Sequence, residues 1–328
     1  MTIDIGRRQF ISALGGAAVT WPLAAHAQQP PMTRVGIVTI QPRTDPNYYA
    51  AFDQRLRELG YVEGQNLALD YINPEHQAGG DAGVIEELLR RKVDIILAPY
   101  ESTLKAALAA GAPVPIVLVA NDYDPLELGY VKSLARPGGK VTGLNLQQFD
   151  LAKKRVELLT QALSSVHTAT VFWDTASENQ WRATSSAAAA FGLQLAGVEL
   201  RDQPYDYEKA LAQAPPDNRG IIIFPISGVF FRDRLRLADF ALRHKIASVF
   251  ASREWVDAGG LFSYGVNLRA LFRRAAELID TIVKGAKAAD LPIEQPTKFE
   301  LVLNLKTAEA IGVTILPGIL VRADEVIE

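Results

Sequence analysis

Short apolar runs that alternate with amphipathic stretches dominate the chain, and this alternation restricts the folds it can adopt. In the first half the pattern predicts strands at 35–40, 66–71, 93–98, 115–120 and 141–144, and helices at 50–59, 83–91, 102–110 and near 126–134. The nearly continuous apolar content of 93–98 is typical of a parallel strand covered on both faces. A series of strand–helix units of this kind predicts a doubly wound α/β sheet.

The same alternation restarts after residue 150. It predicts helices at 151–163, 180–191, 207–212 and 232–244, and strands at 170–173, 193–200, 220–224 and 247–251. A tail adds a helix at 268–284, a strand at 298–304 and a helix at 306–311. Because 328 residues suffice for two domains of ordinary size, we expect two Rossmann-like lobes in tandem.

Composition excludes several classes of protein. The chain is 48% hydrophobic and 22% charged, which is globular rather than disordered composition. Its net charge of −3, without a clustered basic surface, argues against a nucleic-acid partner. Because it has no Cys, it has no disulfide, no thiolate nucleophile and no Cys-ligated zinc.

The N-terminus has the pattern of an export signal. Arg7 and Arg8 precede an uncharged Ala/Gly-rich run, and Ala25-His26-Ala27 has the small-x-small form of a signal-peptidase site. The paired arginines and the weakly apolar run favour the twin-arginine route. The alternative, a membrane anchor, needs a longer and more apolar segment. We therefore expect residues 1–27 to be cleaved and the protein to reside in the periplasm.

No enzyme motif is complete. Gly138-Gly139-Lys140 lacks the earlier Gly and the following Ser or Thr of a phosphate loop, and Ser263 lacks the upstream Gly of a nucleophile elbow. The four histidines are too far apart in sequence to suggest a zinc pair. Asp122 and Asp124 could act as an acid–base pair, but Asp124 followed by Pro is also typical of a helix start. We expect no catalytic residue, no metal and no cofactor.

Polar and aromatic residues instead follow the carboxyl ends of the predicted strands, where open α/β sheets bind ligands. Each could also serve as a helix cap, but together they fit a cleft that anchors the polar ends of a flat or apolar solute. The candidate ligand-binding residues are Gln41, Thr44, Tyr100, Glu101, Ser102, Thr103, Asn121, Asp122, Trp173, Asp174, Ser227, Arg253 and Trp255.

The segment 252–267 combines charged and aromatic residues with a Gly-Gly break, a mixture that predicts a loop rather than core. We expect Ser252 to Trp255 to face the ligand, with Arg253 and the Trp255 indole in contact with it. Gly259 to Gly265 should form a turn, a strand and a hinge.

Four ordered motifs carry a family resemblance: Tyr61–Leu67 (YVEGQNL), Ala135–Gly143 (ARPGGKVTG), Ala258–Gly265 (AGGLFSYG) and Gln295–Ala308 (QPTKFELVLNLKTA). They resemble the ABC-transporter substrate-binding proteins related to the tryptophan-binding component of bacterial uptake systems. The chain departs from many relatives at 100–103, where they carry a Gly-Gly-Thr-Pro-like loop, and at Trp173-Asp174, where an Asn-Pro pair is common. In the first of these loops Glu101 could bind a ligand amine or hydroxyl, or serve only as a solvated or capping residue.

This resemblance implies a type I periplasmic binding fold, in which two lobes joined by three crossings close on a ligand. We expect an N-terminal lobe at 33–146 plus about 266–294, and a C-terminal lobe at 147–265 plus about 295–328. The hinges should lie near 144–148, 263–266 and 292–297.

The implied function is capture of a small organic solute, such as an amino acid or an aromatic or carboxylate compound, by a monomeric protein. The implied partners are an ABC permease and its cytoplasmic ATPase, and contact with the inner-membrane permease should be transient. A periplasmic sensor domain that signals to a membrane receptor, or a secreted α/β enzyme, is the alternative.

Overall fold

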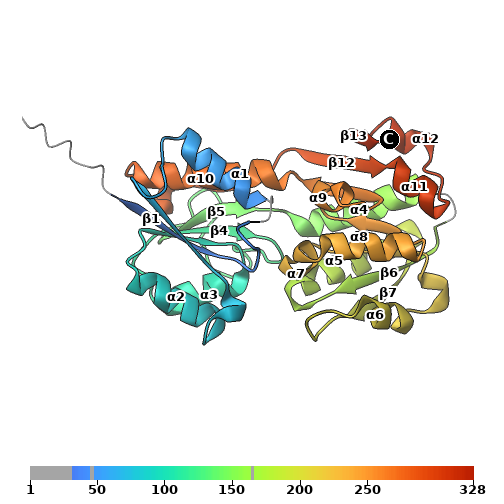
Figure 1. Ribbon diagram of the computed structural model, residues 1–328, viewed down its shortest axis with the longest axis horizontal. Coiled ribbons are helices and arrows are strands. Elements are labelled where there is room, and N and C mark those ends of the chain that lie inside the picture. The colour runs from blue at the N-terminus through green and yellow to red at the C-terminus, as the bar shows by residue number, and fades with distance from the viewer. Residues whose placement is uncertain (1–31, 45–47, 164–165) are drawn as a thin grey trace, which may run out of the picture. The chain divides into compact units, whose positions relative to one another are not determined.

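The computed structural model describes residues 32–44, 48–163 and 166–328. The predicted export signal at residues 1–27 lies outside this range. Contacts within residues 32–328 join the described part into one compact unit that contains two separate sheets. We call each sheet with its covering helices a lobe, and Figure 1 shows both.

The first lobe is built on a six-stranded sheet in the order β11-β5-β4-β3-β1-β2, and all of its neighbouring strands are parallel. Its strands are β1 (Thr33–Val38), β2 (Leu67–Ile72), β3 (Ile95–Ala98), β4 (Ile116–Ala120), β5 (Val141–Asn145) and β11 (Ile293–Glu294). Its helices are α1 (Tyr48–Glu58), α2 (Gly80–Arg90), α3 (Glu101–Ala109) and α10 (Leu268–Val283). In Figure 1, α1 and α10 cover one face, while α2 and α3 cover the other.

The second lobe has a seven-stranded sheet in the order β13-β12-β10-β9-β8-β6-β7, parallel except for the antiparallel β10–β12 pair. Its strands are β6 (Thr168–Trp173), β7 (Gln194–Glu199), β8 (Ile221–Ile223), β9 (Ala247–Phe250), β10 (Phe262–Val266), β12 (Phe299–Asn304) and β13 (Glu325–Ile327). Its helices are α4 (Gln148–Ala162), α5 (Glu178–Ala188), α6 (Tyr207–Gln213), α7 (Gly228–Arg232), α8 (Arg234–Arg243), α9 (Arg253–Asp257), α11 (Leu305–Ile311) and α12 (Pro317–Leu320).

The chain passes between the two sheets three times: from β5 to α4, from β10 to α10, and from β11 to β12. These passages lie within or beside the predicted hinge segments. The lobe boundaries drawn from the sequence stay a prediction, because residues 32–328 cluster as a single unit by their contacts.

Two predicted elements are wrong. The expected helix near 126–134 is a series of turns, because the chain makes one turn after Asp124 and then reaches Gly129 at φ 73°, a left-handed conformation that ends it. Asp124 Oδ1 accepts hydrogen bonds from the backbone N–H of Leu126 at 2.7 Å and of Glu127 at 3.1 Å, so it caps this single turn. The segment after β9, expected to be a loop, forms the short helix α9.

The largest apolar cluster continues from one lobe into the other. It joins Tyr48 and Phe272 of the first lobe to Phe231 and Phe250 of the second. Tyr48 lies at the centre of this junction. Its ring centroid is 4.2 Å from that of Phe272 and 4.8 Å from that of Phe231. The two lobes are therefore in direct apolar contact in this structure.

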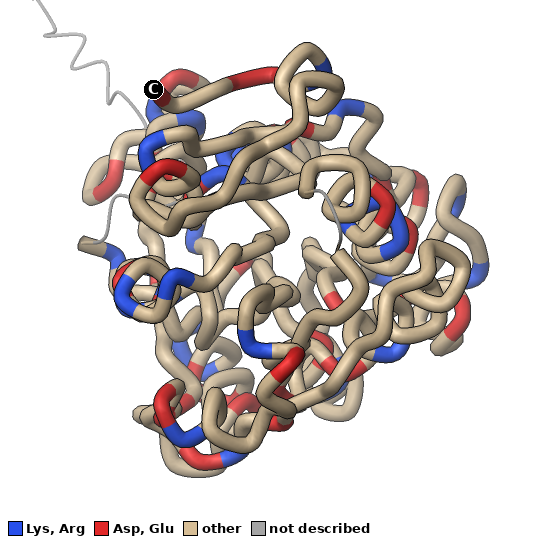
Figure 2. Tube along the Cα trace, turned by 90° about the vertical axis from the view of Figure 1, so that its right-hand side faces the viewer, with Lys and Arg blue, Asp and Glu red and all other residues tan. Residues whose placement is uncertain are grey.

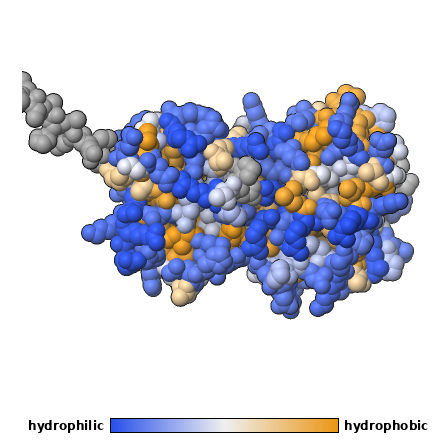
Figure 3. Space-filling view, in the orientation of Figure 1, coloured by the Kyte–Doolittle hydropathy of each residue, from blue (hydrophilic) through white to orange (hydrophobic). Residues whose placement is uncertain are grey.

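The outer surface carries charges of both signs. Figure 2 shows Lys and Arg interspersed with Asp and Glu, and Figure 3 shows hydrophobic residues scattered over a mostly hydrophilic face. Among the described residues, no helix is both long and apolar enough to cross a membrane.

Candidate solute-binding site

A cavity of about 430 Å³ lies where loops of the two lobes meet. The first lobe supplies the loops after β3 and β4, and the second supplies the loops after β6 and β8. Its lining residues are Pro99, Tyr100, Glu101, Ser102, Lys105, Asn121, Asp122, Tyr123, Thr175, Ala176, Glu178, Asn179 and Gly228. Its volume is in the range of small-molecule sites, and its position beyond the strand ends is where such sheets bind ligands.

The loop after β3 builds one wall. Tyr100 is the extended residue before α3, and its hydroxyl accepts a 3.5 Å hydrogen bond from the Ile40 backbone N–H. Glu101 and Ser102 follow in the first turn of α3. The Glu101 carboxylate accepts a 2.7 Å hydrogen bond from the Tyr130 hydroxyl, and burial together with this carboxylate raises the pKa of that tyrosine.

A smaller aromatic recess of about 40 Å³ opens beside this cavity. Its walls combine four aromatic rings with aliphatic and small residues of both lobes: Tyr48, Pro99, Tyr100, Val119, Asn121, Leu146, Ile226, Ser227, Gly228, Phe231, Leu268 and Phe272. This volume suits about one water molecule, whose share of liquid volume is roughly 30 Å³. The aromatic recess is therefore too small in this structure for the ring of a solute, while the cavity of about 430 Å³ can admit a small solute.

Direct hydrogen bonds hold the lobes together around the cavity. The Gln41 amide donates to the Gly228 carbonyl at 2.7 Å, and the Asn121 amide donates to the Ile226 carbonyl at 3.0 Å. The Asp122 carboxylate accepts from the backbone N–H groups that begin α5, at 3.1 Å from Asn179 and 2.8 Å from Gln180. These bonds join loops of the first lobe to helix starts of the second.

Asp122 is electrostatically unusual. Burial raises the pKa of its carboxyl from 3.8 to about 7, although the two backbone donors of α5 act in the opposite direction. The structure thus places a carboxyl with a pKa of about 7 directly between the lobes.

Two buried amide oxygens, one on the lining residue Asn121 and one on Gln41 outside the lining, have no donor among the described residues. Gln41 Oε1 and Asn121 Oδ1 are buried, and no donor among the described residues reaches either atom. Their amide nitrogens are already engaged across the lobes. An N–H or ammonium group of a solute is the kind of partner these acceptors lack.

Asp174 and Ser227 lie behind the cavity and position α7. Asp174 accepts hydrogen bonds at 2.7 Å from Ser227 Oγ and 2.7 Å from Ser177 Oγ, and burial raises the pKa of its carboxyl. Ser227 Oγ in turn accepts from the Phe230 backbone N–H at 3.1 Å, so it caps α7. Of this pair only Ser227 lines the aromatic recess.

Several predicted residues do not line the cavity. Thr103 is buried and donates from Oγ1 to Asp81, on the side of α3 that faces α2. Thr44 is exposed, and Trp173 packs against the second lobe's own core. Arg253 forms ion pairs with Asp257 at 3.4 Å and with Glu325 at 3.0 Å.

Trp255 is fully buried, against our expectation of a ligand-facing indole. Its ring stacks on Phe250 at 5.9 Å and meets Phe231 edge-on at 5.2 Å. Since Phe231 lines the aromatic recess, Trp255 supports that wall from behind.

Sequence reasoning missed the aromatic lining itself. Tyr48, Phe231 and Phe272 lie on helices, at positions that read as ordinary core. The available signal was their position near helix starts. Tyr48 is the first residue of α1, Phe272 is the fifth residue of α10, and Phe231 lies in α7, which follows the Ser227 cap; helix starts face the cleft in this architecture.

Comparison with known proteins places the chain in a family. The family model described as ABC transporter substrate binding protein matches residues 39–327. The curated tyrosine-binding protein of Clostridioides difficile (strain R20291) is 24% identical over 272 residues, covering 79% of this chain and 75% of its own. The chain therefore belongs to the ABC transporter substrate-binding protein family.

Solved structures share the fold. A conserved domain protein from Vibrio cholerae has a TM-score of 0.79 at 23% identity and covers 90% of this chain and 99% of its own. An ABC domain in complex with L-Trp from Streptococcus pneumonia has a TM-score of 0.76 at 22% identity, with 90% and 100% covered. A leucine-binding protein from Thermotoga maritima has a TM-score of 0.57 at 15% identity, with 85% and 87% covered. The predicted α/β architecture of two lobes with the type I periplasmic binding fold is confirmed.

Proposed function

We propose that the exported protein captures an amino acid, or a related aromatic carboxylate, between its lobes and delivers it to an ABC permease driven by a cytoplasmic ATPase. The observation that carries this proposal is the cavity of about 430 Å³ that both lobes line, with an aromatic recess at its side. Aromatic walls with a few fixed polar groups are typical of small-solute sites.

An amino acid suits the polar groups present. Its ammonium group would supply the donor that Asn121 Oδ1 lacks, once the cavity widens enough to expose that buried atom. Its side chain would lie against Tyr100 and the aromatic recess, which must widen beyond about 40 Å³ to accept a ring. The names of two similar proteins agree with this class of solute, since one is a tyrosine-binding protein and another was solved with L-Trp.

Binding is tested by thermal shift and calorimetry of the purified protein with tyrosine, tryptophan, phenylalanine, leucine and 4-hydroxybenzoate, with glucose as a control. We expect at least one amino acid to raise the melting temperature, because a ligand that binds only the folded state stabilises it by mass action. Gln41→Leu should weaken that binding about tenfold or more, since it removes a bond between the lobes to Gly228, a lining residue of the cavity.

Gln65→Leu is the matched control, because Gln65 is exposed and remote from the cavity lining. Equal losses of affinity in both variants, or turnover of a chromogenic ester without any thermal shift, would contradict the proposal.

Export and delivery are tested in cells. Replacing both Arg7 and Arg8 by Lys should retain the protein in the cytoplasm if the twin-arginine route carries it. Deleting the gene should reduce uptake of the labelled solute identified in vitro, and the wild-type gene should restore it. Undiminished uptake in the deletion strain, despite binding in vitro, would instead favour the sensor alternative.

A further inference from the structure

The charged residues that line the cavity of about 430 Å³ are mostly acidic. Glu101 and Asp122 come from the first lobe, and Glu178 comes from the second. Among the lining residues that the structure describes, only Lys105, in the second turn of α3, is basic. A cavity with this balance of charge attracts cations and repels anions.

Of the three carboxylates, Glu101 is the one available to a solute. Its Oε1 accepts the 2.7 Å hydrogen bond from the Tyr130 hydroxyl, which fixes the carboxylate on the cavity wall. No described residue donates a hydrogen bond to its Oε2. The Glu101 side chain is 34% exposed and lines the cavity, so a solute inside can reach the carboxylate.

The other charged groups of the lining are engaged elsewhere or exposed to water. Asp122 already accepts two backbone N–H groups of α5, and Glu178 forms a 2.5 Å ion pair with Arg182 one turn further along that helix. Lys105 Nζ lies 3.9 Å from Glu101 Oε1, beyond hydrogen-bond distance, and the Lys105 side chain is 64% exposed. Such a contact offsets little of the negative charge of Glu101.

The space in the site favours an unbranched side chain over an aromatic ring. The aromatic recess, at about 40 Å³, holds about one water molecule. In the larger cavity, a linear side chain can lie along Tyr100 without widening the recess, and Glu101 directly follows Tyr100 in the chain. A linear side chain with a cationic end therefore fits both the space and the charge of the site.

We propose that the solute is a basic amino acid with an unbranched side chain, such as lysine or ornithine, and that Glu101 is the residue that selects it. The cationic end of the side chain donates to the Glu101 carboxylate, while its stem lies along Tyr100. Glu178 faces the same cavity from the second lobe, so a cation between the lobes favours their closure. This inference rests on the proposed function and narrows its class of solute.

Calorimetry of the purified protein at pH 7 with lysine and norleucine tests the role of charge, because norleucine keeps the linear side chain but lacks its terminal amine. We expect lysine to bind at least tenfold more tightly than norleucine, since hydrogen bonds between charged partners are among the strongest. Glutamate should bind more weakly than either. Added NaCl should weaken the binding of lysine more than that of norleucine.

Glu101→Gln keeps an acceptor for Tyr130 but removes the charge. It should weaken lysine binding about tenfold and leave norleucine binding nearly unchanged, a selective loss that a merely structural role would not produce. Lys105→Met should strengthen lysine binding, because it removes a like charge beside Glu101. Glu86→Gln is the matched control, since it makes the same change at an exposed position of α2 outside the cavity lining. Circular dichroism and melting temperature establish that each variant is folded.

Binding of norleucine, tryptophan or glutamate as tight as that of lysine would overturn the selection of a basic solute. Equal losses of lysine and norleucine affinity in Glu101→Gln would overturn the role of this residue. In both cases an amino acid still binds, so the proposed function stands. If no amino acid binds, both proposals fail.

Discussion

Trp255 illustrates how burial decides the role of a residue. It follows the carboxyl end of β9, where a ligand-facing aromatic residue is plausible, but α9 turns its indole into the core against Phe250 and Phe231. Aromatic rings packed in this way contribute mainly to stability, through buried area and ring contacts.

Trp255→Ala should therefore lower the free energy of unfolding by about 3–5 kcal/mol, the usual cost of deleting a large buried ring. Urea unfolding of wild type and variant measures this difference. Trp173→Ala, at a half-buried position, should cost less. A Trp255→Ala protein with unchanged stability but lost solute affinity would restore the ligand-facing interpretation.

Asp122 makes stability depend on pH. Its pKa is about 7 in the folded protein against 3.8 for the ordinary carboxyl, so the folded state binds this proton more tightly than the unfolded chain. The resulting stabilisation is fully present below about pH 4 and is lost as the pH rises through about 7.

Asp122→Asn removes this titration. The difference in unfolding free energy between wild type and variant should change steadily between about pH 4 and pH 7 and be flat outside that window, as measured by urea unfolding at each pH. Asp124→Asn, at a carboxylate that caps only its own turn, is the control. A difference for Asp122→Asn that stays constant across the window would contradict a raised pKa.

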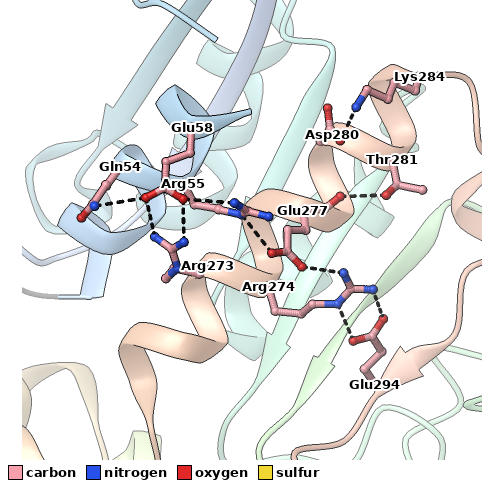
Figure 4. Close-up of polar contacts among 10 residues, drawn as sticks. All are labelled: Gln54, Arg55, Glu58, Arg273, Arg274, Glu277, Asp280, Thr281, Lys284 and Glu294. Atoms are coloured by element: carbon pink, nitrogen blue, oxygen red, sulfur yellow. Dashed lines mark hydrogen bonds and ion pairs between the residues drawn. The ribbon is translucent and has the colours of Figure 1, made fainter. Parts of the chain in front are cut away.

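At the scale of elements, α10 is tied to its neighbours by a partly exposed ion-pair network (Figure 4). Arg273 binds Glu58 of α1 at 2.6 Å, and Arg55 of α1 binds Glu277 at 2.9 Å. Arg274 extends the network to Glu294 of β11. These pairs join the helix after the second passage to the strand before the third.

Because these ion pairs are partly exposed to water, they contribute little to the free energy of unfolding. Arg274→Met keeps the apolar stem but removes the charge, and should lower the free energy of unfolding by about 0.2–1 kcal/mol at low salt. The loss should shrink at 1 M NaCl, where the screening length is about 3 Å. Arg201→Met is the control, because Arg201 is an exposed residue that pairs only locally, with Glu199 at the end of β7. A salt-independent loss of several kcal/mol would show that the network acts as a buried one.

At the scale of the whole molecule, Gly228 permits the lobes to meet. A Cβ atom at this position would lie 2.9 Å from Ile40 Cδ1 and 3.0 Å from the Tyr100 hydroxyl, both in the other lobe. A side chain at this position is disfavoured by close approach rather than by a left-handed backbone. The bond from Gln41 to the Gly228 carbonyl depends on the same approach.

Gly228→Val should hold the lobes apart without unfolding either one. We expect a larger radius of gyration in small-angle X-ray scattering with solute present, and solute affinity reduced by tenfold or more, because closure supplies part of the binding energy. Gly220→Val is the control, since nothing lies within 4 Å of its added Cβ. Unchanged scattering and affinity in Gly228→Val would remove the role assigned to this contact.

The alternation of strands and helices in the sequence was enough to predict two doubly wound lobes. The period and length of each apolar run distinguish a strand from a helix, and both can be read directly from the sequence. The alternation also identified the loops that form the cavity, with Tyr100, Asn121 and Asp122 among them, since strand ends are predictable. The failed helix near 126–134 shows the limit of local signals, as Asp124 and Pro125 predict a start but Gly129 ends the turn.

Only the tertiary structure decided which side chains of those loops and helices face the cavity. It buried Trp255, turned Thr103 toward Asp81, and brought Tyr48, Phe231 and Phe272 together from three helices. Contacts between residues more than a hundred positions apart, such as Gln41 with Gly228, depend on how the lobes meet. No local sequence pattern predicts the contacts between the lobes, because packing across the whole chain determines them.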